Sequence, residues 1–244
     1  MKGSVTMIEI IATCLDDAIK IEKNGGDRIE LISALTEGGL TPSYGLIKKV
    51  LENVNIPVNI MIRPHAKYFT YSKRDIDTMI EDIEMVKKLG ANGVVLGIMD
   101  GNRNVDEENL KLLLRHTGEL EITFHKAIDE SVNIIKSISI LKKHHQIKRI
   151  LTSGGVGNIE DNLDTINKMI SESNNKVILM LGGGLTFDNV EYIINTTKAR
   201  EVHFGTAIRV DSSPFGDIDE NKLKSMVEIV RKNIHETSTN KKTC

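Results

Sequence analysis

The feature that most constrains the fold of this chain is a regular alternation of short apolar segments with longer amphipathic ones. Eight segments of the 244-residue sequence have the apolar and β-branched character of buried strands: MIEIIA (7–12), DRIELI (27–32), PVNIMI (57–62), GVVLGI (93–98), EITFHKA (121–127), RILTS (149–153), VILMLG (177–182) and EVHFGTAI (201–208). Each is followed by a stretch whose apolar residues recur at helical spacing.

This alternation predicts a single-domain α/β fold, the (β/α)8 TIM-type barrel. Near-continuous apolar strands are typical of a parallel sheet that helices cover, and eight strand and helix units in strict succession favour a closed barrel. A doubly wound open sheet is the alternative, but no break in composition and no linker divides the chain. We place the barrel at residues 7–235 and a flexible polar tail at 236–244, and leave the first six residues outside the fold.

Composition narrows the range of partners. The 32 basic and 34 acidic residues nearly cancel, and no Lys/Arg cluster is interleaved with aromatic residues, so we expect no nucleic-acid partner. No apolar run is long enough for a membrane span and the start lacks the apolar region of a signal peptide, so we expect no membrane and a cytoplasmic location. Two cysteines, Cys14 and Cys244, exclude a disulfide framework and a Cys-rich zinc site. The frequency of symmetric dimers among soluble proteins adds the expectation of a homo-oligomer.

Ionisable side chains lie within and just after the predicted strands, where TIM-type barrels carry their chemistry. Glu30 stands in the middle of an apolar strand, and an unpaired carboxylate there is costly. Because residues two apart share a strand face, we expect Arg28 or Arg63 to balance it. The candidate catalytic residues are Glu9, Glu30, Arg63, His125 and His203. An ion-pair network that fills the barrel is the alternative, although two histidines on different strands favour a functional site.

Glycine-rich loops follow the last three predicted strands. In this fold the loops after strands seven and eight often bind phosphate through backbone N–H groups, which the absence of side chains exposes. The residues predicted to bind a small anion are Ser153, Gly154, Gly182, Gly183, Gly184, Gly205 and Thr206. Any one of these loops is also explained as a tight turn that needs a positive φ angle.

Several motifs, taken together and in order, resemble the CutC family. They are RIEL with SAL and GGLTPS, MIRP, GVVLG, TFHKAID, RILTSGG, GGG and VHFGTA, and the resemblance runs from about Met7 to Arg209. It implies a TIM-type barrel, a cytoplasmic location and a role in copper homeostasis through copper binding or trafficking, with copper as the implied ligand.

The sequence departs from the family pattern where copper would bind. Relatives often carry a cysteine after Glu-Ile in the first strand and after Ile-Glu-Leu in the second, whereas this chain has Ile11 and Ile32. Cu(I) prefers thiolate or thioether ligands, which isoleucine cannot supply. The remaining candidate metal ligands are Cys14, His125 and His203.

Two classes of function therefore stay open, and whether the chain is an enzyme is undecided. The first is a copper-binding protein. The second is a metal-independent enzyme for a small anionic or phosphorylated metabolite, in which Arg63 neutralises the anion while Glu30 and His125 act as general base and acid. Lys126 is expected to face away from His125, which disfavours Schiff-base chemistry. An oligomeric scaffold, a third possibility, would leave the polar lining unexplained.

Overall fold

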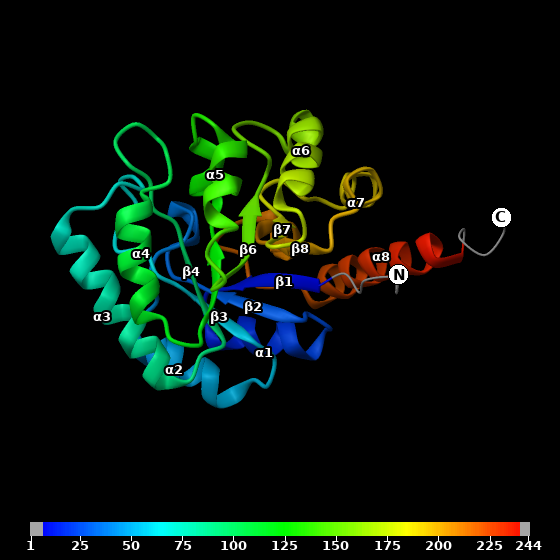
Figure 1. Cartoon of the computed structure of the whole chain (residues 1–244). Helices are drawn as coiled ribbons and strands as arrows, with labels where there is room; N and C mark the ends of the chain where they lie inside the picture. Colours follow the sequence, from blue (N-terminus) through cyan, green and yellow to red (C-terminus); the bar gives the residue numbers. More distant parts are fainter. Residues whose placement is uncertain (1–6, 240–244) are drawn as a thin grey trace.

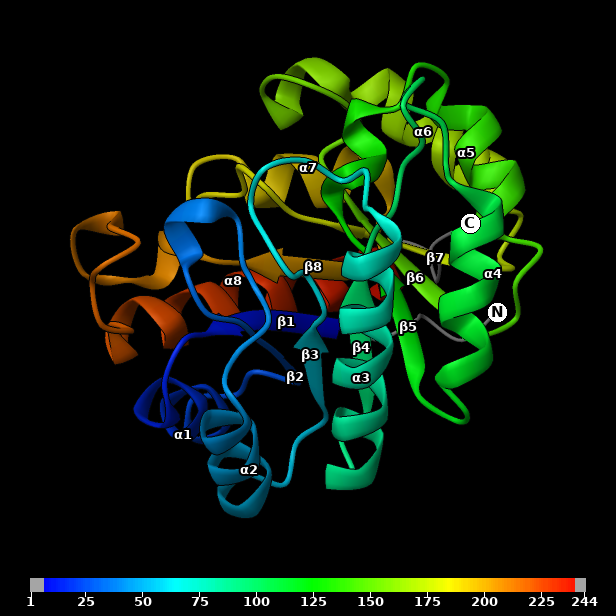
Figure 2. The same cartoon turned by 90° about the vertical axis from the view of Figure 1, so that its left-hand side faces the viewer.

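A computed structural model describes residues 7–239, with side chains to residue 232. Over this part of the chain the strands form one closed parallel barrel in the order β1 to β8, and helices surround it (Figures 1 and 2). The strands are β1 (Met7–Ala12), β2 (Arg28–Leu31), β3 (Val58–Met61), β4 (Gly93–Leu96), β5 (Glu121–Phe124), β6 (Ile147–Thr152), β7 (Ile178–Leu181) and β8 (Glu201–Phe204). This confirms the predicted fold class.

The helices follow the strands in the predicted alternation. They are α1 (Leu15–Lys23), α2 (Tyr44–Asn53), α3 (Lys73–Leu89), α4 (Glu107–His116), α5 (Ile134–Leu141), α6 (Leu163–Ser173), α7 (Val190–Thr197) and α8 (Glu220–Thr239). Helix α8 thus includes the first four residues of the predicted polar tail, and 240–244 lie outside the described residues. The flexibility of that tail stays a prediction. None of the helices in the described residues is long and apolar enough to span a membrane.

Local sequence signals set the helix boundaries. Ser72 and Asp75 form a reciprocal capping box at the start of α3, which Gly90 ends in the left-handed conformation (φ 79°). Asp106 caps α4 by accepting a hydrogen bond from the backbone N–H of Asn109. These caps satisfy backbone groups that a helix end would otherwise leave without partners.

The two faces of each strand point into two different buried regions, the layer between the barrel and the helices and the inside of the barrel. Residues such as Ile8, Ile10 and Ile29 point outward and pack against the helices, where they form the main hydrophobic core. The alternate residues, among them Glu9 and Arg28, point into the barrel and are also buried. Because the side-chain period of a strand is two residues, one local pattern produces both regions.

Two predicted strands, 121–127 and 201–208, end three or more residues earlier than expected, at Phe124 and Phe204. The chain turns into a 3-10 helix, η2 (Lys126–Glu130), directly after β5, and into η4 (Thr206–Ile208) shortly after β8. The strand rule of alternating faces therefore stops at Phe124 and Phe204, and it does not apply to Lys126 or Thr206.

Candidate functional site

A cavity of about 560 Å³ opens where the strands end and their following loops begin. Its lining combines side chains from six of the strands or their ends with the loops after β7 and β8. Glu30, His125 and His203 contribute polar groups, while Ile11, Met61 and Leu151 contribute apolar ones. Three of the five predicted catalytic residues therefore meet at one cavity, and Glu9 lies directly behind it through its contact with His203.

Below the cavity, the barrel interior holds a continuous ion-pair ladder. Arg28 lies between Glu9 and Glu201, and Arg149 lies between Glu201 and Glu121. Burial opposes the charge on Arg28, but its two carboxylate partners raise its pKa above the ordinary value. The sequence interpretation missed Glu201, Arg149 and Glu121, although alternation could have found them, because Glu201 shares a strand face with His203.

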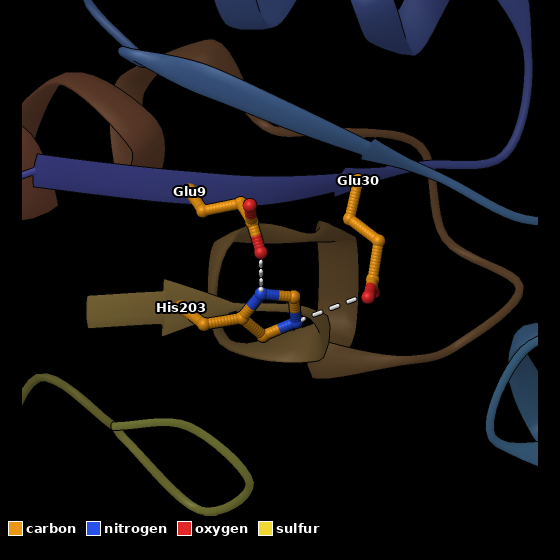
Figure 3. A group of neighbouring side chains, drawn as sticks. All are labelled: Glu9, Glu30 and His203. Atoms are coloured by element: carbon orange, nitrogen blue, oxygen red, sulfur yellow. Dashed lines mark hydrogen bonds and ion pairs between the residues drawn. The ribbon is translucent and has the colours of Figure 1, made fainter. Parts of the chain in front are cut away.

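Above this ladder, His203 lies between two carboxylates, as Figure 3 shows. Its Nδ1 is 2.9 Å from Glu9 Oε1, and its Nε2 is 3.6 Å from Glu30 Oε2. All three side chains are at most 5% exposed. The partner of Glu30 is thus His203 rather than the expected Arg28 or Arg63, because Arg28 is already paired with Glu9 and Glu201.

The two carboxylates have different protonation behaviour. Burial raises the pKa of Glu9, but Arg28 and His203 outweigh it and lower that pKa to about 2. Glu30 lacks a direct guanidinium partner, and burial raises its pKa to about 7. Burial lowers the pKa of His203, yet the charges of Glu30 and Glu9 raise it overall. Glu9 is therefore an anion at neutral pH, whereas burial keeps the pKa of Glu30 near neutral pH beside a His203 whose own pKa is raised.

His125 occupies another wall of the cavity and is 4% exposed. Burial, with a smaller contribution from the Arg63 charge, lowers its pKa to about 3, so the ring is neutral at pH 7. One face packs on Phe69, with ring centroids 4.9 Å apart. On another side lies Gly97, where a Cβ atom would come within 2.3 Å of the imidazole, so only glycine leaves room for this ring position.

Arg63 does not line the cavity. Its guanidinium donates to the backbone carbonyls of Glu37 (2.6 Å) and Gly39 (3.0 Å) and stacks over the Phe69 ring at 4.8 Å. These bonds fix the loop after β2 and support the ring that packs on His125. The structure therefore gives Arg63 a positioning role and leaves it little capacity to neutralise an anion.

The predicted anion-binding residues separate into two groups. Gly183, Gly184, Gly205 and Thr206 line the cavity, and Ser153, Gly154 and Gly182 do not. In the loop after β6, the backbone N–H groups of Ser153 and Gly154 already donate to Asp129 and Thr152. In contrast, the N–H groups of Gly183 and Gly184 have no acceptor among the described residues.

Lys126 faces the cavity, contrary to the expectation that it points away from His125. Because the chain turns early into η2, the side chains of His125 and Lys126 both line the cavity. Lys126 Nζ donates to Ser153 Oγ (2.8 Å) and lies so close to Gly183 that a Cβ there would be 2.2 Å away. It also pairs with Asp129 at 3.4 Å, and it places one cation next to the free N–H groups at this wall of the cavity.

The predicted metal ligands are not brought together. Cys14 is exposed, does not line the cavity and caps α1 by accepting from the backbone N–H of Asp17 at 3.4 Å. His125 and His203 do line it. At the two positions where the family resemblance led us to expect cysteine, Ile11 and Ile32 pack with Met61 and Val95 in a small apolar cluster. The donors at this cavity therefore do not fit a Cu(I) thiolate site.

Glu9, Glu30 and His203 also do not suit a single hard cation. Their nearest ligand atoms lie within 4.8 Å of one another. However, His203 turns Nδ1 to Glu9 and Nε2 to Glu30, and an imidazole binds a given ion through one nitrogen. Glu9 is in addition paired with Arg28. The three side chains form a chain of carboxylate, imidazole and carboxylate.

A known protein family matches most of the chain. The family model for CutC matches residues 6–208. The chain belongs to the CutC family. The CutC family protein of Glaesserella parasuis serovar 5 is 37% identical over 200 residues, 81% of each chain. The human copper homeostasis protein cutC homolog is 34% identical over 206 residues, 84% of this chain and 75% of the relative. The resemblance inferred from the motifs is confirmed.

Solved structures agree with the family and with the fold. The CutC protein of Streptococcus agalactiae superposes with a TM-score of 0.78 at 34% identity and covers 84% of this chain and 100% of its own. Phosphoribosylanthranilate isomerase from Thermotoga maritima has a TM-score of 0.63 at 13% identity, over 93% of this chain and 100% of its own. The second likeness concerns the barrel fold alone.

Proposed function

We propose that this CutC-family chain is a metal-independent enzyme that binds a small anionic metabolite and transfers a proton on it. The carrying observation is Glu30, a carboxyl that is 2% exposed, faces the cavity and has a pKa raised to about 7 by burial. A base whose pKa lies near the working pH combines an adequate ionised fraction with adequate basicity.

The two side chains behind Glu30 support this role. His203 Nε2 lies 3.6 Å from Glu30, and Glu9 orients the ring through Nδ1 at 2.9 Å. The Glu9 carboxylate stabilises the imidazolium form, so His203 can receive or return a proton while Glu30 changes charge. The ladder of ion pairs holds the Glu9 carboxylate in place, so the position of Glu9 behind His203 is fixed.

The wall of the cavity formed by Lys126, Gly183 and Gly184 would hold the anion of the substrate. The N–H groups of Gly183 and Gly184 have no acceptor among the described residues, and the Lys126 ammonium group, which also pairs with Asp129 at 3.4 Å, adds a positive charge beside them. The rest of the cavity is mainly apolar, with Phe69, Phe187 and Leu35 among the lining. A metabolite with one phosphate or carboxylate group and a less polar body would match both parts.

The direct test is substrate discovery under metal-free conditions. A small-molecule extract would be incubated in the presence of a chelator with wild type, Glu30→Gln, or Glu52→Gln, the same change on the exposed face of α2. We expect mass spectrometry to show an anionic compound consumed by wild type and by Glu52→Gln, and preserved with Glu30→Gln. Equal consumption by Glu30→Gln, or a requirement for added metal, would overturn the proposal.

Copper homeostasis is the second candidate, because relatives such as the human protein carry it in their names. The donor set argues that any such role does not use tight Cu(I) coordination in this cavity. Cu(I) would be titrated against a strong chelator under reducing conditions with wild type, Cys14→Ser and His125→Ala. We expect no competition from any of the three. Competition by wild type that Cys14→Ser or His125→Ala removes would restore the copper-binding interpretation.

A further inference from the structure

Two buried polar atoms at the cavity lack a hydrogen-bond partner among the described residues: Glu30 Oε1 and His125 Nε2. Both residues are at least 95% buried. A buried donor or acceptor without a partner costs about 1–3 kcal/mol, so a ligand in the cavity that completes these two atoms gains binding free energy. One is a carboxyl oxygen and the other an imidazole nitrogen, and these two groups indicate which kinds of atom the ligand presents to them.

The hydrogen bonds of the backbone decide the tautomer of His125. The backbone N–H of Ala127 donates to His125 Nδ1 at 3.1 Å, and an amide N–H can only donate. Nδ1 therefore carries the lone pair, and in the neutral ring the proton lies on Nε2. The unpartnered atom is thus an N–H donor on a residue that lines the cavity, and it requires an acceptor.

Packing holds this donor in a fixed direction. The ring lies between Phe69, which Arg63 supports at 4.8 Å, and the side-chain-free surface of Gly97. No carboxylate contacts His125 among the described residues, which distinguishes it from His203. The surroundings therefore oppose an imidazolium and favour a neutral hydrogen-bond donor.

We infer that the substrate is a carbonyl compound, that His125 Nε2–H donates to its carbonyl oxygen, and that Glu30 removes the proton from the adjacent carbon. This deepens the proposed function and rests on it. The C–H electron pair becomes the C=C bond of an enolate, the C=O π pair moves to oxygen, and the proton goes to the Glu30 carboxylate. Return of that proton to the same carbon restores the ketone and completes an exchange or an epimerisation without a redox partner. A neutral imidazole stabilises the developing oxyanion by hydrogen bonding and keeps its own proton.

The tautomer is tested first, on the free protein. Long-range proton–nitrogen NMR of protein labelled with ¹⁵N-histidine should show one histidine as the neutral Nε2–H tautomer from pH 5 to 8, and this signal should be absent in His125→Phe. A protonated ring or an Nδ1–H tautomer at this position would overturn the inference.

The carbonyl preference is tested with two probes of equal length that share a phosphate. Dihydroxyacetone phosphate contains the ketone, and glycerol 1-phosphate has an alcohol in its place. Calorimetric titration should show the ketone bound about five- to tenfold more tightly by wild type, the size expected for one good hydrogen bond. His125→Phe should lose this preference, and His125→Gln, which retains an N–H donor, should keep part of it.

Different results would contradict the carbonyl inference and the anion-binding proposal. If glycerol 1-phosphate binds but the ketone binds no more tightly, or if His125→Phe keeps the preference, the carbonyl inference is wrong while the anion-binding proposal stands. If neither probe binds, both fail. Hydrogen–deuterium exchange at the carbon next to the ketone, followed by ¹H NMR in D₂O, should occur with wild type and not with Glu30→Gln.

Discussion

The lower and upper halves of the barrel interior use the same types of side chain in opposite ways. In the lower half, Arg28 and Arg149 connect Glu9, Glu201 and Glu121 so that each buried charge meets an opposite one. In the upper half, Glu30 Oε1 and His125 Nε2 remain without partners. The difference indicates that the lower network supports the fold, and that the upper groups are arranged for a ligand.

The electrostatic consequences of the two halves also differ. Below, the close guanidinium of Arg28 lowers the pKa of Glu9 to about 2 against the effect of burial. Above, burial dominates and moves the pKa of Glu30 up to about 7 and that of His125 down to about 3. A buried group with a full set of opposite charges stays ionised, and one without them becomes neutral.

The largest expected effect comes from opening the lower ladder. Arg28→Met leaves Glu9 and Glu201 as buried carboxylates without their shared cation, and it should reduce the free energy of unfolding by about 3–5 kcal/mol in urea denaturation. Lys49→Met, which removes the cation of an exposed pair with Glu52, should change it by less than about 1 kcal/mol. A similar small loss for both variants would contradict a structural role for the ladder.

A second prediction concerns His125 and acid stability. Its pKa is about 3 in the folded protein and 6.5 in the unfolded chain, so the unfolded state binds more protons between these values. Its contribution to stability is thus complete above pH 6.5 and declines as the pH falls, by about 2 kcal/mol between pH 7 and 5. Denaturation curves should show this decline in wild type relative to His125→Gln. Parallel pH dependence of the two proteins would refute the neutral buried ring.

Glu30 should produce the opposite slope. Its folded pKa of about 7 exceeds the unfolded value of 4.5, so the folded state binds more protons and stability decreases as the pH rises from 4.5 through 7. Because His203 is coupled to it, we expect a decrease on the order of 1–2 kcal/mol between pH 5 and 8. Glu30→Gln should remove it. A variant that loses stability at pH 8 would show that the ionised carboxylate is well paired.

The smallest expected effect lies at the anion wall. Gly183 and Gly90 both have a φ of 79°, so alanine at either position should cost about 1 kcal/mol of stability. Only at Gly183 would the added Cβ lie 2.2 Å from Lys126 Nζ, whereas nothing lies within 4 Å at Gly90. Titration with glycerol 1-phosphate should therefore show weaker binding for Gly183→Ala and unchanged binding for Gly90→Ala. Equal affinities of the two variants would show that the glycine loop takes no part in anion binding.

The sequence by itself determined the barrel, the family and the inward position of most candidate side chains. These are consequences of local periodicity, because alternation along a strand fixes which residues share a face. It placed Glu30, His125 and His203 correctly on the inner surface. The rule failed at Lys126, because the turn into η2 ends the strand one residue before His125.

Only the tertiary structure decided which inward groups meet. Closure of the barrel pairs β8 with β1, so His203 contacts Glu9 across 194 residues of sequence. Arg28 is held by Glu9 and Glu201, and Arg63 by the carbonyls of the loop after β2, so neither is free to pair with Glu30. A guanidinium takes whichever acceptors the fold brings within reach, and strand periodicity contains no information about those distances between strands.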